Sequence, residues 1–471
     1  MNIFFEYEKK DYKGSFLETK TERESFKSVL NKLWAERKQF GLTSIYFEDD
    51  NQTEQQFFSF YDSYIKAGKY IGTIKYGNEV IQILPKILEN GSKKYSKVEL
   101  LEISNKNLLW WLSRCSKIKF PKTFSGWNTR SFSFLDILIH LFATLTRDDL
   151  VFNRHQSYIE KEESIGTLRG RIDFKKYSTN YFTGNAHILP CVYDSLEINN
   201  LYNQVIKFTS KLLVQNTNSD EIKNVLQEII WILDDVEDVF LTNTDCERIV
   251  VSPLNDNMKI IIDYCRMFLS GMSIKTDDDD HEIFTFLIPT EKLFEDFLFG
   301  FIKNEFQYSP GIKNIQSQGD QEGKQRPLAL EKNEAGLVLK SSFKLKPDIY
   351  ISKKSKDLIL DTKYKSIYSK EEALENDRNK NGVSISDIYQ MLAYTVKLDV
   401  KTCHLLYPDS IGVNATLGTH YEIKHNYKKE VSKVYYHRIP TLIENEVGEL
   451  TEIIEEKEKQ LFNHLRKIID G

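Results

Sequence analysis

Two aspartates and one lysine in the C-terminal part of the chain have residue types and spacing suited to metal-dependent chemistry. Asp348 follows the dipeptide Lys-Pro, and Asp361 and Lys363 lie in the run Leu-Ile-Leu-Asp-Thr-Lys. Carboxylates suit Mg²⁺, which keeps several waters and takes one or two acidic ligands together with substrate phosphate. A nearby lysine can orient or deprotonate an attacking water and balance charge on a phosphate. The three residues therefore predict a site that acts on phosphate.

A β-hairpin is expected to bring these side chains together. Phe343–Ile351 and Leu358–Lys365 have the residue types of strands and flank the polar loop Ser352–Asp357. If the residues that border the loop pair with each other, the antiparallel register places Asp348 directly opposite Asp361. The hairpin would then hold both carboxylates beside one bend.

Asp361 and Lys363 are two residues apart and therefore share one face of a strand. Asp361 also follows the apolar run Leu-Ile-Leu, which is typical of an interior strand, and an aspartate there needs a partner or a function. The alternative is a surface hairpin whose charges are solvated. The apolar context favours the catalytic interpretation.

A helix is expected over Ile288–Ile302, with Pro289 and Thr290 as its start and cap. Its apolar residues recur at helical spacing: Leu293, Phe294, Phe297, Leu298 and Phe301. Glu295 lies beside this stripe. Its carboxylate either points into a cleft as a further ligand or is an ordinary charged residue at the edge of an amphipathic helix.

A second helix is expected around Asp387–Tyr394. Gln390 and Tyr394 are four residues apart in it and share one face. An amide and a phenol at these positions could hold a DNA strand or the lysine. Alternatively, both residues belong to the core, with Gln390 a polar neighbour whose hydrogen bonds are satisfied.

The order of these motifs resembles the PD-(D/E)xK nuclease core in its RecB-like form. The motifs are Glu295, Pro347-Asp348, Asp361-Thr-Lys363 and Gln390-x-x-x-Tyr394. More narrowly, several segments are similar to McrC, the endonuclease subunit of McrBC-type modification-dependent restriction systems: Leu-Phe-Glu-Asp-Phe, Lys-Pro-Asp-Ile, Leu-Ile-Leu-Asp-Thr-Lys-Tyr-Lys, Tyr-Gln-Met-Leu-Ala-Tyr, Ile83–Ile87 and Gly166–Phe174. The resemblance runs from about residue 60 to about residue 410. No resemblance is identified for the first sixty residues or for the tail after about residue 420, and their role is left open.

The resemblance implies a DNA endonuclease that uses Mg²⁺, or Mn²⁺ in its place, to hydrolyse a phosphodiester. It implies roles for six residues: Asp348 and Asp361 as metal ligands, Glu295 as a supporting ligand, Lys363 as the water-orienting residue, and Gln390 and Tyr394 as residues that position the strand. The implied substrate is double-stranded, modified DNA. The implied partner is an McrB-like AAA+ GTPase ring, which recognises the modification and is stimulated when the N-terminal part of the nuclease subunit docks.

Composition indicates an ordinary globular protein. The 471 residues are 41% hydrophobic and 28% charged, which is enough to build sizeable cores in about three domains. Five scattered cysteines without a Cys-x-x-Cys pair favour reduced thiols, and no signal peptide or long apolar run is found, so a cytoplasmic location away from membranes is expected. The sequence has no GxxxxGK[ST] motif, so GTP hydrolysis would have to come from the partner.

The net charge of −5 argues against a protein that coats DNA by bulk electrostatics. Residues 340–370, however, contain nine lysines against three aspartates, which would attract phosphate. Lysines that guard the edge of a hairpin against aggregation are the alternative.

The expected fold is α+β with three domains. Residues 1–95 are expected as a β-rich domain that docks on the partner, and the turn Gly77-Asn78 joins a clear hairpin within it. Residues 96–280 are expected as a mainly helical domain, with helices over Phe134–Leu145 (capped by Ser133), Leu201–Val214 and Ile222–Leu233. Residues 281–471 are expected as an α/β PD-(D/E)xK domain with a mixed sheet.

The polar segment Arg154–Asp173 is expected as a loop within the helical domain. Arg169 and Arg171 in it could meet a carboxylate or phosphate on the partner or on DNA, or could form internal salt bridges. The four aspartates at 277–280 are expected as a flexible acidic linker, since consecutive aspartates cannot all face one ion.

Two other functions remain consistent with the sequence. A RecB-like repair nuclease would act on free DNA ends without a GTPase partner. A non-catalytic adaptor would only regulate an AAA+ ring, although the intact set of acidic residues and lysine speaks against that function.

Overall fold

The computed structural model describes residues 2–470 except 40, 49, 78, 119, 121–132, 153–154, 218, 251–255, 273–282, 318–326, 334–336, 366–382 and 425–430. The acidic run at 277–280 lies outside the described residues. The chain divides into two compact units. The first contains Met1–Ala35, Ile45–Phe132 and Thr285–Gly471, and the second contains Glu36–Ser44 and Ser133–Phe284. None of the described helices is both long and apolar enough to cross a bilayer.

Two small sheets form around the N-terminal residues of the first unit. The larger has the order β1 (Asn2–Phe5), β6 (Glu79–Leu84), β5 (Tyr70–Tyr76) and β10 (Ile283–Pro289), and the smaller has the order β2 (Lys9–Asp11), β4 (Tyr64–Ala67) and β3 (Phe58–Phe60). The hairpin predicted around Gly77 is confirmed, since Tyr76 pairs with Glu79 and Gly77 has a φ of 55°. Helix α1 (Lys20–Glu36) was not predicted. It buries Phe26, Val29, Leu30, Leu33 and Trp34 at helical spacing.

Long-range contacts join the N-terminal part of the chain to residues 283–306. Strand β10 adds to the edge of β5, where a Cβ on Gly72 would lie 2.0 Å from the carbonyl oxygen of Phe286. Helix α2 (Lys97–Arg114) packs against helix α9 (Thr290–Phe306), and the ring of Trp111 stacks on that of Phe297 at 5.8 Å. Residues from all three expected domains therefore belong to one unit. Local sequence patterns did not predict this, because the residues that pair lie far apart in the sequence.

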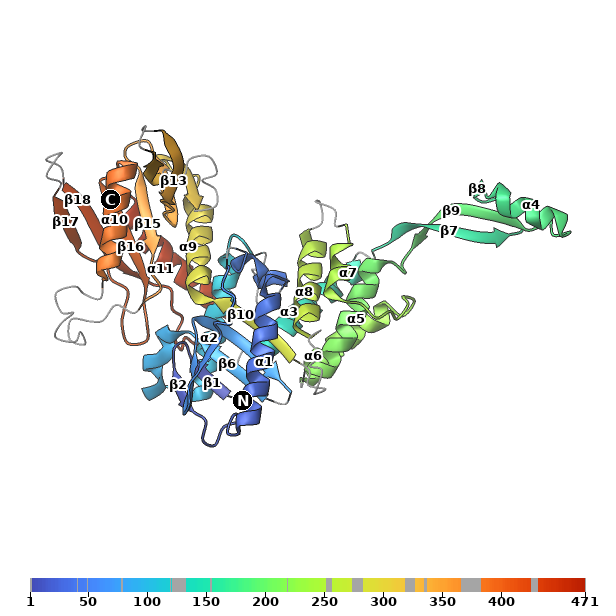
Figure 1. Cartoon of the computed structure of the whole chain (residues 1–471), viewed down its shortest axis with the longest axis horizontal. Coiled ribbons are helices and arrows are strands. Elements are labelled where there is room, and N and C mark those ends of the chain that lie inside the picture. The colour runs from blue at the N-terminus through green and yellow to red at the C-terminus, as the bar shows by residue number, and fades with distance from the viewer. Residues whose placement is uncertain are drawn as a thin grey trace. The chain divides into compact units, whose positions relative to one another are not determined.

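A six-stranded sheet forms the C-terminal part of the first unit (Figure 1). Its order is β11 (Ile312–Ser317), β14 (Ile349–Lys353), β15 (Leu358–Thr362), β16 (Thr402–Pro408), β18 (Val431–Ile439) and β17 (His420–Lys424). The sheet is mixed, as predicted, since β15, β16 and β18 run parallel while β11 and β17 pair antiparallel with their neighbours. Helix α10 (Ile385–Leu398) packs on β16 and β18, and α11 (Leu450–Asp470) also contacts β18. A separate ribbon is formed by β12 (Pro327–Lys332) and β13 (Val338–Lys344).

The second unit is built on helices, as predicted for this part of the chain. They are α3 (Phe134–Phe152), α5 (Leu201–Asn216), α6 (Asp220–Ile232), α7 (Asn243–Glu247) and α8 (Asp256–Met272). The three predicted helices correspond to α3, α5 and α6. The hydroxyl of Ser133 accepts a hydrogen bond from the backbone N–H of Asp136 at 3.1 Å, so the predicted cap of α3 is confirmed.

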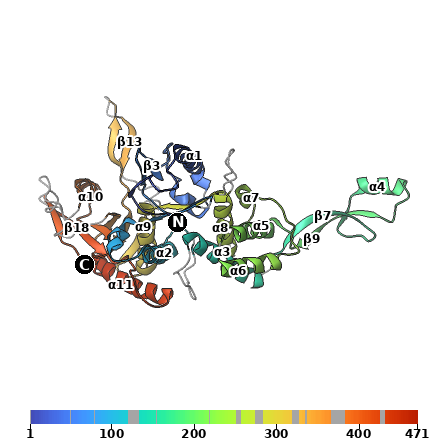
Figure 2. The same ribbon diagram turned by 90° about the horizontal axis from the view of Figure 1, so that it is seen from below.

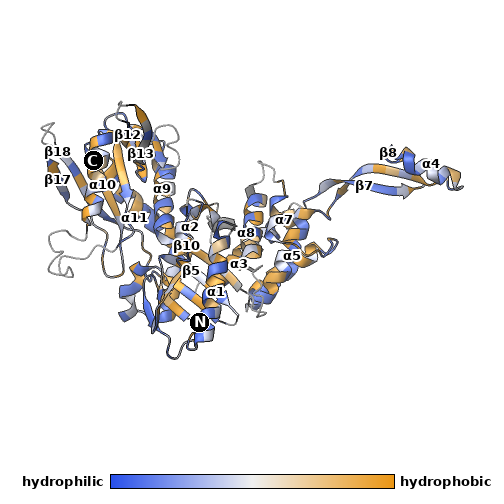
Figure 3. Ribbon diagram, viewed as in Figure 1, coloured by the Kyte–Doolittle hydropathy of each residue, from blue (hydrophilic) through white to orange (hydrophobic). Residues whose placement is uncertain are grey.

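A sheet arm extends from these helices (Figures 1 and 2). It consists of β7 (Ser157–Ile165), β9 (Leu189–Glu197), the short β8 (Arg171–Ile172) and α4 (Phe174–Phe182). The prediction of a loop over Arg154–Asp173 was wrong, because β7 pairs along its whole length with β9. Charged residues on the solvated strand hid the strand signal. The arm carries hydrophobic residues among hydrophilic ones (Figure 3), and Phe174 and Phe182 are 75% and 86% exposed.

Candidate active site

The register of the β14–β15 hairpin is the one that the sequence predicts. Ile351 pairs with Leu358 and Ile349 pairs with Leu360. Asp348 directly precedes β14, where its Oδ2 accepts hydrogen bonds from the backbone N–H (2.8 Å) and the hydroxyl (2.7 Å) of Thr362. The Asp348 carboxylate is thereby fixed beside the end of β15 that carries Asp361.

The predicted extent of the first strand was wrong. Phe343–Ile351 is not one strand, since β13 ends at Lys344 in a different sheet and β14 begins at Ile349. Pro347 lies between them, and a proline has no N–H to continue a ladder of hydrogen bonds. The break leaves Asp348 outside the ladder with its side chain available to the site.

Asp361 is the most buried of the predicted site residues. It is 0% exposed, and its Oδ2 lies 2.5 Å from the ammonium nitrogen of Lys363. Burial, and secondarily the Asp348 carboxylate, raise the pKa of Asp361 to about 8, although Lys363 acts in the opposite direction. Burial lowers the pKa of Lys363, but the carboxylates of Asp361 and Asp348 outweigh it, and the pKa lies above its usual value. The lysine therefore stays charged beside the carboxylate.

Helix α10 brings an amide to this pair. Gln390 Oε1 accepts a hydrogen bond from Lys363 Nζ at 3.0 Å, and Gln390 Nε2 donates to the Tyr394 hydroxyl at 2.8 Å and to Asp361 Oδ1 at 3.4 Å. The Tyr394 hydroxyl in turn donates to the carbonyl oxygen of Lys346 at 3.0 Å. Gln390 is half-buried at the site, whereas Tyr394 is 2% exposed within the core that α10 forms with the sheet.

Glu295 lies on α9 with its side chain 14% exposed, and its Oε2 pairs with Lys292 at 3.1 Å. Burial, and secondarily the charge of Asp348, raise the pKa of Glu295 to about 7. The Asp348 carboxylate is therefore close enough to Glu295 for its charge to affect the pKa of Glu295. The expected cap of this helix was wrong, because the Thr290 hydroxyl donates to Glu6 Oε1 at 2.8 Å instead of capping.

Within the described part of the chain, no three His, Cys, Asp or Glu side chains are arranged as a ligand set for a metal ion. Two carboxylates suffice for Mg²⁺, which completes its shell with waters and substrate phosphate. Asp361 Oδ2 is fully buried and close to Lys363, yet it accepts no hydrogen bond of acceptable geometry. This oxygen already lies against one cation, the Lys363 ammonium, and carboxylate oxygens are the ligands that Mg²⁺ prefers, so Asp348 and Asp361 fit the expected Mg²⁺. The role of Glu295 as a supporting ligand stays a prediction.

Several residues that hold the site were not predicted. Lys365 binds both carboxylate oxygens of Asp387 at 3.1 Å, and the Tyr407 hydroxyl donates to Asp387 Oδ2 at 3.3 Å, which ties the start of α10 to β15 and β16. Asp387 also forms a capping box with Ser384. The spacing Ser-x-x-Asp before an apolar run was a visible signal for that cap.

Two of the nine lysines counted in residues 340–370 neutralise internal carboxylates. Lys363 pairs with Asp361 and Lys365 pairs with Asp387, whereas Lys346, Lys354 and Lys356 are exposed. Phosphate contact by the exposed lysines stays a prediction.

Arg169 and Arg171 lie in the arm of the second unit. The guanidinium of Arg169 lies 4.2 Å from the centroid of the Tyr193 ring, and Arg171 pairs with Glu160 at 3.2 Å. Both side chains of this pair are exposed, so its ionic contribution to stability is small. The internal salt bridge, one of the two predicted alternatives, thus exists for Arg171. The pairing of β7 and β8 with β9 holds the arm in shape.

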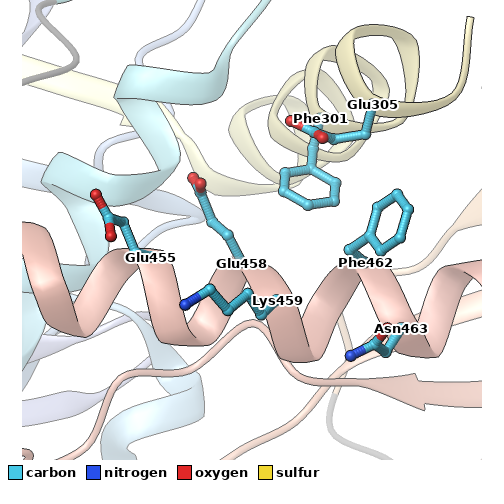
Figure 4. A pocket seen from close by; sticks show the side chains of 7 residues that line it. All are labelled: Phe301, Glu305, Glu455, Glu458, Lys459, Phe462 and Asn463. Atoms are coloured by element: carbon cyan, nitrogen blue, oxygen red, sulfur yellow. The ribbon is translucent and has the colours of Figure 1, made fainter.

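A pocket of about 370 Å³ lies between α9 and α11, and none of the predicted site residues lines it (Figure 4). It is lined by Phe301, Glu305, Glu455, Glu458, Lys459, Phe462 and Asn463. Arg114 pairs with both Glu305 and Glu458, so two of the three carboxylates that line the pocket are structural partners of this arginine.

Comparisons with known proteins match nearly the whole chain. Residues 65–408, more than half of the 471, match the family model for the McrBC 5-methylcytosine restriction system component. A chain of the refined half-complex from the tetradecameric assembly of Thermococcus gammatolerans McrB AAA+ hexamers with bound McrC aligns with a TM-score of 0.66 and 16% identity, over 98% of this chain and 99% of that chain. A chain of the cryo-EM structure of the Thermococcus gammatolerans McrBC complex aligns with a TM-score of 0.45 and 18% identity, over 64% of this chain and 86% of that chain. No curated protein sequence matches.

Proposed function

The chain belongs to the family of McrBC 5-methylcytosine restriction system components, and from this premise we propose that it is the DNA-cleaving subunit of such a system. The proposed reaction is Mg²⁺-dependent hydrolysis of a phosphodiester in double-stranded, modified DNA. One observation carries the proposal: Asp348, Asp361 and Lys363 converge at the end of a buried strand, with Gln390 bonded to the lysine. A surface hairpin with solvated charges would not bury Asp361 completely.

Each residue has a distinct role in the proposed mechanism. Asp348 and Asp361 would hold the metal, which when bound would polarise the scissile phosphate and supply an activated water. Thr362 keeps Asp348 oriented through two hydrogen bonds. Lys363 would orient the attacking water and stabilise the charge that develops on the phosphate. Gln390 holds the lysine in place through its Oε1.

The proposal includes an AAA+ GTPase partner. The aligned Thermococcus chain comes from an assembly of McrB AAA+ hexamers with bound McrC. The sequence of this chain has no phosphate-binding loop, so GTP hydrolysis would belong to the partner. Residues 1–95 are proposed to dock on the ring, and Arg169 and Arg171 to contact the partner or DNA. Docking by residues 1–95 is best tested with point substitutions in that segment. Removal of the whole segment would also remove β5, which pairs with β10.

Reconstitution with an McrB-like AAA+ GTPase tests the proposal. DNA containing 5-methylcytosine should be cleaved only when the chain, the partner, GTP and Mg²⁺ are all present, and this chain should raise the GTP turnover of the partner. Asp361→Ala should abolish cleavage while retaining that stimulation. Unchanged GTP turnover would contradict the partnership, and cleavage by Asp361→Ala at the wild-type rate would contradict the site.

A further inference from the structure

Two lysines lie directly opposite each other on neighbouring strands at the N-terminal end of the first unit. Lys9 of β2 pairs with Lys66 of β4, and Asp11 pairs with Tyr64 two residues along. Residues two apart in a strand share a face, so these four side chains lie on the same side of the small sheet. We call Tyr7, Lys9, Tyr61, Tyr64 and Lys66 the tyrosine–lysine face.

Like charges directly opposite each other destabilise a strand pair. Among the described residues, neither lysine is in an ion pair with a carboxylate, Asp11 of the same face included. Each ammonium instead lies over a tyrosine ring, Lys9 at 5.2 Å from the centroid of Tyr64 and Lys66 at 5.7 Å from that of Tyr7. Ring contacts hold the two lysines in place without neutralising them. The face therefore presents two lysine charges against the one carboxylate of Asp11 and keeps an excess of positive charge for an anion, although the whole chain is negative.

Tyr7 has a backbone conformation that a tyrosine rarely adopts. Its φ is 64°, in the left-handed region, within a turn closed by a hydrogen bond from the Glu8 N–H to the Phe5 carbonyl at 3.1 Å. Glycine or asparagine is the usual residue at such a position, and strain of this kind concentrates at functional sites. The strained turn presents a side chain that is 41% exposed beside the lysines.

The face is connected to the candidate active site within the first unit. The ammonium of Lys86 lies 5.2 Å from the centroid of the exposed Tyr7 ring and 4.6 Å from that of the buried Tyr364 ring. Tyr364 directly follows Lys363 in the chain. The Lys86 side chain and one buried tyrosine thus lie between the surface at Tyr7 and the backbone that carries the proposed catalytic lysine.

From this arrangement we propose that the tyrosine–lysine face binds the phosphate backbone of the DNA substrate outside the site of cleavage. The proposal rests on the proposed nuclease function. Paired lysines without carboxylate partners complement the regularly spaced phosphates of DNA. The phenol hydroxyls of Tyr61 and Tyr64, whose rings stack at 4.5 Å, are further donors to phosphate. The GTPase ring, on which residues 1–95 are proposed to dock, would then use another surface of this segment. An acidic surface of that ring is the competing occupant of the tyrosine–lysine face, and the experiment separates the two.

Binding of a fluorescent duplex of arbitrary sequence is measured in EDTA, where hydrolysis is blocked, at a series of salt concentrations. Lys9→Gln/Lys66→Gln should weaken binding and reduce the slope of log K against log salt by about 1.8, the value for two lost phosphate contacts. Lys9→Arg/Lys66→Arg should keep the wild-type slope. The control is Lys20→Gln/Lys27→Gln on α1, which removes the same charge from exposed positions. Thermal melting checks that all variants fold.

The proposal is overturned if the Lys9/Lys66 variant has the same salt slope as the α1 control, or if the wild-type chain does not bind duplex DNA. An unchanged slope with a loss of GTPase stimulation would assign the face to the partner and would also overturn it. Failure of the nuclease function is distinguishable, because it would appear as absent cleavage while DNA binding and its salt slope persist.

Discussion

Glu6 at the end of β1 and Tyr364 beside the proposed catalytic lysine are joined by a buried hydrogen bond. The Tyr364 hydroxyl donates to Glu6 Oε2 at 3.1 Å across 358 positions of sequence. The same carboxylate accepts from the backbone N–H of Lys86 at 2.9 Å and from the Thr290 hydroxyl at the start of α9. Burial raises the pKa of Glu6 despite these donors. The N-terminal sheet, the start of α9 and the segment that follows β15 therefore meet at one side chain.

Replacement of Glu6 by alanine should destabilise the protein by roughly 3 kcal/mol, since a buried donor left unpaired costs about 1–3 kcal/mol and hydroxyl donors can partly reorient. Urea unfolding measures the loss. Glu24→Ala, which removes an exposed carboxylate of α1, should change stability by no more than about 0.5 kcal/mol. Equal effects of the two substitutions would refute the structural role of Glu6.

Mg²⁺ should stabilise the wild-type chain against heat. A ligand that binds only the folded state adds about 2.7 kcal/mol at a hundredfold excess over its Kd. Asp361→Asn keeps the shape of the side chain and removes its charge, so melting curves of this variant should not respond to Mg²⁺. Glu295→Gln should retain part of the response if Glu295 only supports the metal. A full response in Asp361→Asn would remove Asp361 from the metal site.

Gln390→Ala should lower cleavage by tenfold or more while it costs only about 1 kcal/mol of stability, the net value of a typical hydrogen bond. Gln390 is half-buried, and its amide bonds to Lys363 and Tyr394 at the edge of the site. Tyr394→Phe is the matched comparison, because it removes a hydroxyl from a nearly fully buried ring and leaves the Lys346 carbonyl without that donor. Parallel thermal melts and cleavage assays should show the larger stability loss for Tyr394→Phe. A large melting shift with normal activity in Gln390→Ala would mean that Gln390 serves only packing.

The site was predictable where its geometry is local. The register that places Asp348 near Asp361 follows from two short apolar runs and the loop between them. Gln390 and Tyr394 were predicted to share one face because residues four apart in a helix do so, and Gln390 contacts Asp361. The pairing of β10 with β5, and of Glu6 with Tyr364, depends on residues hundreds of positions apart, for which no local pattern exists. The arm was missed for another reason: solvated charges mask the alternation of β7.

A pair of buried histidines should make the protein sensitive to acid. His404 Nδ1 and His437 Nε2 lie 2.9 Å apart, and burial lowers the pKa of His404 to about 3 and that of His437 to about 4. The unfolded chain binds protons at its usual pKa near 6.5, so the folded state loses stability as the pH falls from about 6.5 to 4. Urea unfolding at pH 7 and pH 4.5 should show a smaller loss for His404→Gln/His437→Gln than for the wild type. His420→Gln, at a more exposed histidine, is the control, and an equal loss in all three proteins would contradict the assignment.

Cleavage by Lys363→Ala tests the central claim most directly. The assay contains this chain, the proposed GTPase partner, GTP, Mg²⁺ and methylated DNA, and Lys313→Ala is the control because that lysine is exposed on β11 of the same sheet. Loss of the amine that is proposed to orient water and stabilise the developing charge should reduce the cleavage rate by about 10²-fold or more. Lys313→Ala should cleave close to the wild-type rate, and both variants should still stimulate GTP turnover. Cleavage by Lys363→Ala at the wild-type rate would contradict a nuclease centred on Asp348, Asp361 and Lys363.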